Sequence, residues 1–126
     1  MSDFSYNEQI INFDNILSCE PVQLKMLTRT KRYIDFNFSN TINLKNLALS
    51  QGLSSHKLKK LFKFYFGLSP KQYQINRRIQ KAKVNLLNGL KVSDSCYDVG
   101  FNSVTTFSKL FKSKEGMSPR QFQKNK

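Results

Sequence analysis

Residues 54–73 read SSHKLKKLFKFYFGLSPKQY, and residues 103–122 read SVTTFSKLFKSKEGMSPRQF. The two stretches are identical at nine of twenty positions, including the KLFK run, the glycine and the Ser-Pro pair. In each stretch the apolar residues follow the spacing of one helix face, the glycine can end that helix, and Ser-Pro can begin the next one. Self-similarity at a fixed spacing is typical of a repeated structural unit. The chain is therefore predicted to contain two copies of one helical unit.

The residues before each stretch extend the repeat with an offset of 48, which leaves one extra residue after the second glycine. The aligned pairs are Leu44 and Val92, Ala48 and Cys96, and Gly52 and Gly100. Each copy is then a short helix, a turn with a glycine, and a second helix with one apolar and one basic face. This is the layout of a helix-turn-helix unit. Two helical hairpins stacked only for stability are the alternative, which the strongly basic outward faces disfavour.

Capping residues, prolines and glycines predict seven helices between residue 21 and the C-terminus. The first spans about 21–36, and the others follow the predicted N-caps Asn43, Ser54, Ser69, Ser93, Ser103 and Ser118. No run of alternating apolar and polar residues is long enough for a sheet. We expect an all-α, bilobal domain in which two helix-turn-helix units, about 44–66 and 93–115, are joined by a long linker helix, about 70–88.

The charge of the chain points to a polyanionic partner. Its 126 residues, enough for one domain, include 21 Lys and Arg against 8 Asp and Glu, a formal net charge of +13. Residues 1–24 hold four of the acids and no Lys or Arg, so the positive charge is concentrated from Lys25 onward. Such a field favours nucleic acid first and an anionic membrane surface second. Binding to a membrane or to RNA is indicated by charge alone.

Several classes of protein are disfavoured by what the sequence lacks. No apolar run approaches the roughly 20 residues of a membrane span, and the polar, acidic N-terminus is unlike a secretory signal. Cys19 and Cys96 are far apart, and His56 is the single histidine. Neither a disulfide framework nor a His- or Cys-based metal or catalytic site is therefore indicated. We expect no enzyme activity, no metal and no cofactor, in a reducing cytoplasm.

Residues 1–20 differ from the rest of the chain. Tyr6, Ile10, Phe13 and Leu17 follow helical spacing in an acidic segment. We interpret this segment as an arm or the remnant of a linker, separate from a basic domain of residues 21–126. A contact surface for a partner or a second copy is the interpretation that stays open.

Several short motifs stand at matching places in the two copies. The first copy carries Leu47-Ala48, Gly52-Leu53-Ser54, Leu58, Leu61-Phe62-Lys63 and Gly67-Leu68-Ser69-Pro70, followed by Arg78-Ile79 and Ala82. The second carries Val99-Gly100-Phe101, Phe107, Phe111-Lys112, Gly116-Met117-Ser118-Pro119 and Phe122. Over about residues 24–123 the chain thereby resembles the DNA-binding domain of the AraC/XylS family of bacterial transcription regulators. It departs from the family at Ser95, where an aliphatic residue is usual, and at Gln123, where the family often has Arg.

The resemblance implies a sequence-specific transcription regulator that binds double-stranded DNA. Its two second helices are expected in successive major-groove segments, about 34 Å apart. The base-contacting candidates of the first unit, His56, Lys59 and Lys60, match the positions that read bases in the family. Those of the second unit are Val104, Thr105, Ser108 and Lys109, of which Lys109 matches Lys60 in the repeat. Lysine can donate to guanine, whereas the methyl groups of Val104 and Thr105 suit a thymine methyl. For Val104, packing on the preceding turn is an equally open role.

Seven further residues are candidates for contacts to DNA phosphates: Lys57, Lys63, Lys71, Arg77, Arg78, Lys112 and Arg120. Lys71 and Arg120 follow the two Ser-Pro helix starts, where backbone N–H groups also face an anion. For Arg78, a packing or pairing role between the two lobes is at least as strongly indicated. About eight neutralised phosphates would make log K fall with log[salt] at a slope of about −7.

One chain with two such units covers an asymmetric site of about two helical turns, so we expect a monomer to bind DNA. Dimerisation is expected only through a missing or separate N-terminal region. RNA polymerase is a second candidate partner, no membrane contact is expected, and the expected location is the cytoplasm, at the nucleoid. The alternative function is a protein–protein interaction module of the same fold that no longer reads DNA. Many family members carry an effector-binding domain, so a stand-alone regulator and a C-terminal fragment are both open.

Overall fold

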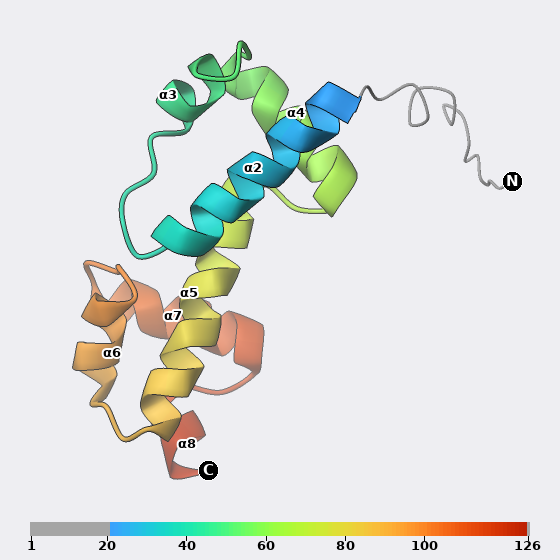
Figure 1. The fold of residues 1–126 in the computed structure, drawn as a ribbon. Coiled ribbons are helices and arrows are strands. Elements are labelled where there is room, and N and C mark those ends of the chain that lie inside the picture. Colours follow the sequence, from blue (N-terminus) through green and yellow to red (C-terminus); the bar gives the residue numbers. More distant parts are fainter. Residues whose placement is uncertain (1–20, 126) are drawn as a thin grey trace, which may run out of the picture. The chain divides into compact units, whose positions relative to one another are not determined.

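The computed structural model describes residues 21–125, which form seven helices and no strand (Figure 1). The helices are α2 (Pro21–Asn37), α3 (Leu44–Leu49), α4 (Ser55–Phe66), α5 (Pro70–Leu87), α6 (Val92–Asp98), α7 (Val104–Glu115) and α8 (Pro119–Lys124). The predicted all-α class is confirmed. The arm predicted for residues 1–20 lies outside the described residues.

The chain divides into two compact units between Arg32 and Tyr33, within α2. In the described part of the first unit, the side chains of Leu27 and Thr30 are fully buried. The Thr30 hydroxyl donates a hydrogen bond to the carbonyl oxygen of Met26, one turn earlier. The second unit contains the end of α2 and all later helices, and both helix-turn-helix copies therefore lie in it. The domain boundary predicted near residue 21 stays a prediction.

Five helices of the second unit begin at the predicted capping residues. Each capping side chain accepts a hydrogen bond from the backbone N–H three residues later, which satisfies one of the unpaired donors of a helix start. These N-caps are Asn43, Ser54, Ser69, Ser103 and Ser118. Ser69 and Ser118 also form capping boxes, in which the side chains of Gln72 and Gln121 accept a hydrogen bond from the N-cap backbone N–H.

The prediction that Ser93 caps α6 is wrong. The helix begins at Val92, and its N-cap is Lys91, whose side chain makes no capping hydrogen bond. The Val92 side chain packs against the core of the second helix-turn-helix unit, and this packing favours its inclusion in the helix. Asp94 in the first turn supplies a negative charge near the helix N-terminus, where it is stabilising.

The two helix-turn-helix turns match in their backbone hydrogen bonds. The N–H of Leu53 donates to the carbonyl oxygen of Ala48 (2.9 Å), and the N–H of the equivalent Phe101 donates to that of Cys96 (3.1 Å). Between the turn glycine and the N-cap of the second helix, the second copy has two residues, Phe101 and Asn102, where the first copy has only Leu53, and this is the extra residue that the sequence alignment required. The repeat seen in the sequence is therefore a structural repeat, α3–α4 and α6–α7.

Helix α5 joins the two helix-turn-helix units (Figure 1). Helix α5 contacts α4 of the first unit, and α6 and α8 pack along its C-terminal half. Helix α7 then packs against α6 and α8. The core of this half consists of Ile79, Ala82, Leu86, Cys96, Val99, Phe101, Phe107 and Phe111. Ser95 is also fully buried, and its hydroxyl donates a long hydrogen bond (3.4 Å) to the Ala82 carbonyl oxygen. A polar residue is thereby accommodated where the resemblance predicts an aliphatic one.

The loop of residues 38–40, between α2 and α3, lies at the junction of the two helix-turn-helix units. Its carbonyl oxygens accept hydrogen bonds from Gln74 and Arg78 of α5. The same loop also lies close to the α6–α7 turn. A Cβ atom added to Gly100 of that turn would be only 2.3 Å from the Ser39 carbonyl oxygen. Glycine at residue 100 therefore permits the backbone of the 38–40 loop to approach the turn of the second helix-turn-helix unit.

Candidate nucleic-acid interface

Helix α4 separates its apolar and basic side chains cleanly. Leu58 and Phe62 are fully buried, because they follow the four-residue spacing that brings side chains to one face of a helix. The opposite face exposes the predicted base-contacting residues His56, Lys59 and Lys60, together with the predicted phosphate-contacting residues Lys57 and Lys63. The sequence-based assignment of this face as solvent-accessible and basic therefore agrees with the structure.

Helix α7 repeats the arrangement with fewer charges. Phe107 and Phe111, equivalent to the two buried residues of α4, are fully buried. Thr105, Lys109 and Lys112 are exposed. The two lysines stand at the repeat positions of Lys60 and Lys63, so each second helix carries a pair of lysines on the side away from its buried aromatic residue.

Two predicted base-contacting residues of α7 are less accessible than the rest. Val104 is half-buried and packs against the core cluster of the second unit. Ser108 is also half-buried, beside Val104 and Pro119 in a surface cavity of about 530 Å³. The packing role that the sequence left open for Val104 is thus present in the structure, which leaves Thr105 and Lys109 as the exposed base-contacting candidates of this helix.

The two Ser-Pro helix starts each place one basic side chain in solvent. Lys71 and Arg120 are the second residues of α5 and α8, and both are exposed. The positive end of a helix dipole lies at the same place, so an anion near either side chain would meet two favourable fields. Neither side chain makes an ion pair within the described part of the chain.

Arg78 uses its guanidinium inside the protein. Its Nε donates to the Phe38 carbonyl oxygen at 2.6 Å, and its Nη2 donates to the Asn40 carbonyl oxygen at 3.2 Å. The guanidinium carbon lies 5.2 Å from the centre of the Phe101 ring, in the range of a cation–π contact. Burial lowers the pKa of Arg78 from its ordinary value. These contacts join both helix-turn-helix units through α5, which is the packing role left open for this residue.

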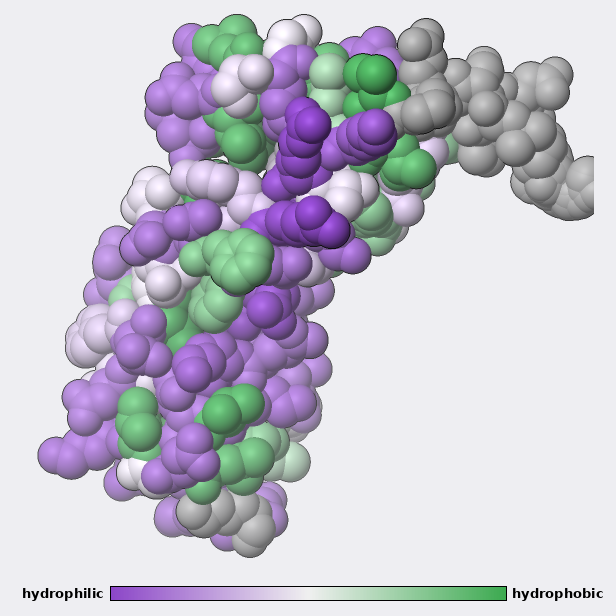
Figure 2. Space-filling model, viewed as in Figure 1, coloured by the Kyte–Doolittle hydropathy of each residue, from purple (hydrophilic) through white to green (hydrophobic). Residues whose placement is uncertain are grey.

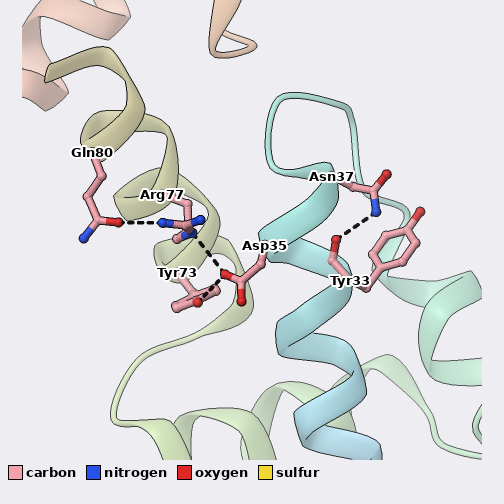
Figure 3. A network of polar contacts seen from close by, with 6 residues as sticks. All are labelled: Tyr33, Asp35, Asn37, Tyr73, Arg77 and Gln80. Carbon is pink, nitrogen blue, oxygen red and sulfur yellow. Dashed lines mark hydrogen bonds and ion pairs between the residues drawn. The ribbon is translucent and has the colours of Figure 1, made fainter. Parts of the chain in front are cut away.

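Arg77 is likewise engaged, on the neighbouring side of α5. Its Nε forms an ion pair with Asp35 at 3.0 Å, and its Nη1 donates to the side-chain oxygen of Gln80 at 2.9 Å (Figure 3). The Tyr73 hydroxyl donates to the same Asp35 carboxylate. Burial and this carboxylate raise the pKa of Tyr73 to about 12. The contacts of Asp35 with Tyr73 and Arg77 hold the end of α2 against α5. Because its guanidinium is used in these contacts, Arg77 is less available to a phosphate than the exposed lysines.

Sequence reasoning missed one residue of the α4 surface. Phe64 is 58% exposed and shares a shallow depression with His56, Lys60 and Lys63. The signal was present in the repeat, because the position equivalent to Phe64 in the second copy is the polar Ser113. Single exposed apolar side chains are common on protein surfaces, and it is the position of Phe64 among the predicted DNA-contacting residues that makes it a candidate contact residue.

Two other kinds of site, a metal site and a membrane span, are not found among residues 21–125. The side that Figure 2 presents is mostly hydrophilic, with small separate apolar areas. Over residues 21–125, no cluster of three or more His, Cys, Asp or Glu side chains is placed to hold a metal ion. None of the helices in the same range is long and apolar enough to cross a bilayer.

Comparison with known sequences places the chain among helix-turn-helix proteins. A family model for a helix-turn-helix domain matches residues 47–125, more than half of the chain. The chain is also similar to an uncharacterized HTH-type transcriptional regulator in the cgkA 5′ region of Pseudoalteromonas carrageenovora, with 37% identity over 76 residues. That match covers 60% of this chain and 45% of the relative. The chain thus spans less than half the length of this relative.

Comparison with solved structures gives the same fold. The C-terminal domain of AraT, a response regulator from Geobacillus stearothermophilus, has a TM-score of 0.75 at 26% identity, covering 86% of this chain and 88% of that one. A probable AraC family transcriptional regulator from Rhodopseudomonas palustris has a TM-score of 0.73 at 22% identity, covering 80% and 96%. These likenesses support the predicted arrangement of two helix-turn-helix units joined by α5.

Proposed function

The chain belongs to the AraC family of helix-turn-helix transcription regulators, and from that premise we propose that it reads double-stranded DNA by placing α4 and α7 in successive segments of the major groove. The family consists of DNA-binding regulators rather than enzymes. An α-helix fits the major groove of B-form DNA, where each base pair presents its own pattern of donors and acceptors. Sequence-specific readout by both helices is the proposed mechanism.

The observation that carries this proposal is the pairing of exposed lysines across the repeat. Lys60 and Lys109 occupy equivalent positions on α4 and α7, each opposite a buried aromatic side chain. Both lysines are exposed and neither makes an ion pair within residues 21–125. Solvated lysines held on two equivalent helices can donate to guanine O6 and N7 at two separated places.

The proposed base contacts combine both helices. In the first half-site they come from His56, Lys59 and Lys60, and in the second from Thr105 and Lys109, with Ser108 and Val104 at its less accessible edge. Contacts to bases supply the sequence preference, whereas contacts to phosphates fix the register of the protein on the duplex.

The proposed phosphate contacts come from the five predicted phosphate-contacting residues whose side chains are exposed: Lys57, Lys63, Lys71, Lys112 and Arg120. Arg77 and Arg78 are bound within the protein and would add little. If each exposed side chain neutralises one phosphate, log K falls with log[salt] at a slope of about −5. This is shallower than the slope expected from the sequence, because fewer cations are free to meet DNA.

The proposal is tested by selecting bound sequences from a random duplex pool and measuring the affinity of the selected site over a salt series. Lys60→Ala and Lys109→Ala should each cost roughly 1–3 kcal/mol of binding free energy and relax the base preference in their own half only. Lys81→Ala is the matched control, since Lys81 is an exposed lysine of α5 outside both second helices. A flat salt dependence would overturn the proposal. A loss that is uniform over all sequences would make both lysines phosphate contacts.

We further propose that one chain suffices for binding, because it carries two recognition helices. A second copy would be recruited only through a separate N-terminal region, and RNA polymerase would be a partner at the promoter rather than a requirement for binding. The proposed place of action is the bacterial nucleoid in the cytoplasm. Sedimentation of the complex with the selected duplex should give one chain per site, and two chains per site would contradict this.

The competing hypothesis is an interaction module of the same fold that binds RNA polymerase or another regulator and does not read DNA. No contact within residues 21–125 favours this competing hypothesis. The exposed lysines of α4 and α7 favour DNA binding instead. Capture of RNA polymerase at high salt by a protein that shows no duplex binding at any salt concentration would support the competing hypothesis instead.

A further inference from the structure

The end of α4 differs from the end of α7 in a way that the repeat makes visible. Phe64, Tyr65 and Phe66 stand where the second copy has Ser113, Lys114 and Glu115. Phe66 turns inward, with its ring centre 4.7 Å from that of the buried Phe62. Phe64 turns outward and is 58% exposed. One of the three aromatic residues therefore serves the core, and Phe64 requires another explanation.

Phe64 lies on the recognition face of α4. It follows His56 and Lys60 at intervals of four residues, which brings all three side chains to one side of the helix. A shallow depression of about 470 Å³ is lined by His56, Lys59, Lys60, Lys63, Phe64 and Ser69. Tyr65 supports the Phe64 ring from the side, in an edge-to-face contact with the ring centres 5.0 Å apart.

The surroundings of the ring decide which partner fits it. Three exposed lysines and a histidine border the depression, so a protein partner would have to cover these cations to reach a single ring. Duplex DNA instead brings phosphates to the lysines. It also presents one apolar group in the major groove, the 5-methyl group of thymine, which aromatic and small apolar side chains contact.

We propose that Phe64 contacts the 5-methyl group of a thymine in the half-site read by α4 and thereby makes this half-site prefer thymine at one position. The inference rests on the proposed function of α4 as a recognition helix. No such preference is expected at the equivalent place in the second half-site, because Ser113 cannot supply the apolar contact.

The test replaces the thymines of the selected duplex one at a time by uracil, which removes the methyl group and leaves the base pair unchanged. With the unmodified protein, one position in the α4 half-site should weaken binding about fourfold, the amount expected for one buried methyl group. With Phe64→Ala, the thymine and uracil duplexes should bind equally at that position. Phe64→Leu keeps an apolar side chain and should keep most of the discrimination.

Three controls make the result specific. Ser113→Ala changes the equivalent residue of α7 and should leave the whole uracil scan unchanged. Uracil in the α7 half-site should have the same effect on the unmodified protein and on Phe64→Ala. Urea unfolding of the Phe64 variants, which change an exposed ring, should show folded proteins. If Phe64→Ala is unstable, Phe64→Ser carries the test, because it places the residue of the second copy at this position and should also bind the thymine and uracil duplexes equally.

The inference and the proposed function fail in different ways. Sequence-specific binding with an identical uracil scan for the unmodified protein and Phe64→Ala would overturn the thymine contact and leave the proposed function standing. Absence of any sequence-specific duplex binding would overturn both. A Phe64→Ala variant that binds every duplex normally but loses capture of RNA polymerase would show that this surface binds protein, which also overturns the inference.

Discussion

Gln74 and Gln123, which are 49 positions apart, make the same pair of hydrogen bonds. Each side-chain amide donates to two backbone carbonyl oxygens of the segment that leads into a helix-turn-helix unit, residues 38–40 for the first unit and residues 86–90, from the last turn of α5 onward, for the second. Gln74 donates to Phe38 and Asn40 (3.1 and 2.9 Å), and Gln123 donates to Leu86 and Leu90 (2.9 and 2.7 Å). The repeat thus includes the glutamine hydrogen bonds that hold the segment before each helix-turn-helix unit in place. At residue 123, where the resemblance led us to expect Arg, Gln therefore has a structural role of its own.

We expect Gln123→Ala to lower the free energy of unfolding by about 1–2 kcal/mol, since it leaves two carbonyl oxygens with fewer donors. Gln123→Glu should cost more, because its carboxylate would face the same oxygens and cannot donate when ionised. Lys81→Ala, which changes an exposed side chain of α5, should stay within about 0.5 kcal/mol. Urea denaturation measures all three. Equal stability of Gln123→Glu and the unmodified protein would refute the double hydrogen bond.

Gly52 and Gly100 form a matched pair for testing the junction of the two units. Both have positive φ, 75° and 104°, but a Cβ atom at Gly52 meets nothing within 4 Å, whereas one at Gly100 meets the Ser39 backbone. Gly52→Ala should therefore cost about 1–2 kcal/mol of stability from the left-handed conformation alone. Gly100→Ala should cost about 3 kcal/mol or more, because backbone must also move. Similar unfolding midpoints for the two variants would contradict the close approach.

Alanine substitutions of Arg78 and Lys71 should have opposite effects on two measured quantities, the free energy of unfolding and the salt dependence of DNA binding. Arg78→Ala is expected to lower the free energy of unfolding by roughly 1–3 kcal/mol, since it removes two hydrogen bonds to backbone carbonyls. It should leave the salt dependence of DNA binding unchanged. Lys71→Ala should do the reverse, with unchanged stability and a salt slope shallower by about 1. An Arg78→Ala variant with normal stability and a shallower slope would reassign Arg78 to the phosphate contacts.

The hydrogen bond from Tyr73 to Asp35 predicts a dependence of stability on alkaline pH. The pKa of Tyr73 is raised to about 12 from an ordinary value near 10, so the folded state holds the phenol proton more tightly than the unfolded state. The stabilisation is complete below about pH 10 and is lost as pH rises toward 12. The unmodified protein should exceed Tyr73→Phe in stability by about 1 kcal/mol at pH 8, and the difference should shrink between pH 10 and 12.

Urea unfolding of the two proteins at matched pH values checks this prediction. The comparison with Tyr73→Phe cancels the titration of the other tyrosines and the lysines, which both proteins share. A difference that stays constant from pH 8 to pH 12 would show that the Tyr73 proton is not held by Asp35.

Local chemistry made most helix starts predictable. The side chains of Ser54 and Ser103 reach backbone N–H groups only three residues away, so their role follows from the sequence without knowledge of the rest of the fold. Ser93 was misassigned because the start of α6 depends on the packing of Val92 against residues distant in sequence. A capping residue in the correct pattern does not cap a helix when a neighbour gains more by burial.

For the candidate site, the sequence predicted which helix faces are exposed but not which of their basic side chains are bound within the protein. The four-residue spacing identified the exposed faces of α4 and α7 correctly, since periodicity decides which side of an amphipathic helix is buried. It could not distinguish a free cation from an engaged one. Arg77 and Lys71 were both predicted from the sequence to contact phosphates, and only the tertiary structure brings a carboxylate, that of Asp35, to one of them.

The sequence by itself determined that two copies of a helical unit exist, which face of each second helix is buried, and that the remaining faces are basic. These properties depend on residue type and on spacing within one helix. The tertiary structure alone decided that Arg77 and Arg78 bind within the protein, that Val104 packs against the core, and that Phe64 remains outside. These outcomes depend on contacts between segments far apart in the chain, whose geometry no local pattern encodes.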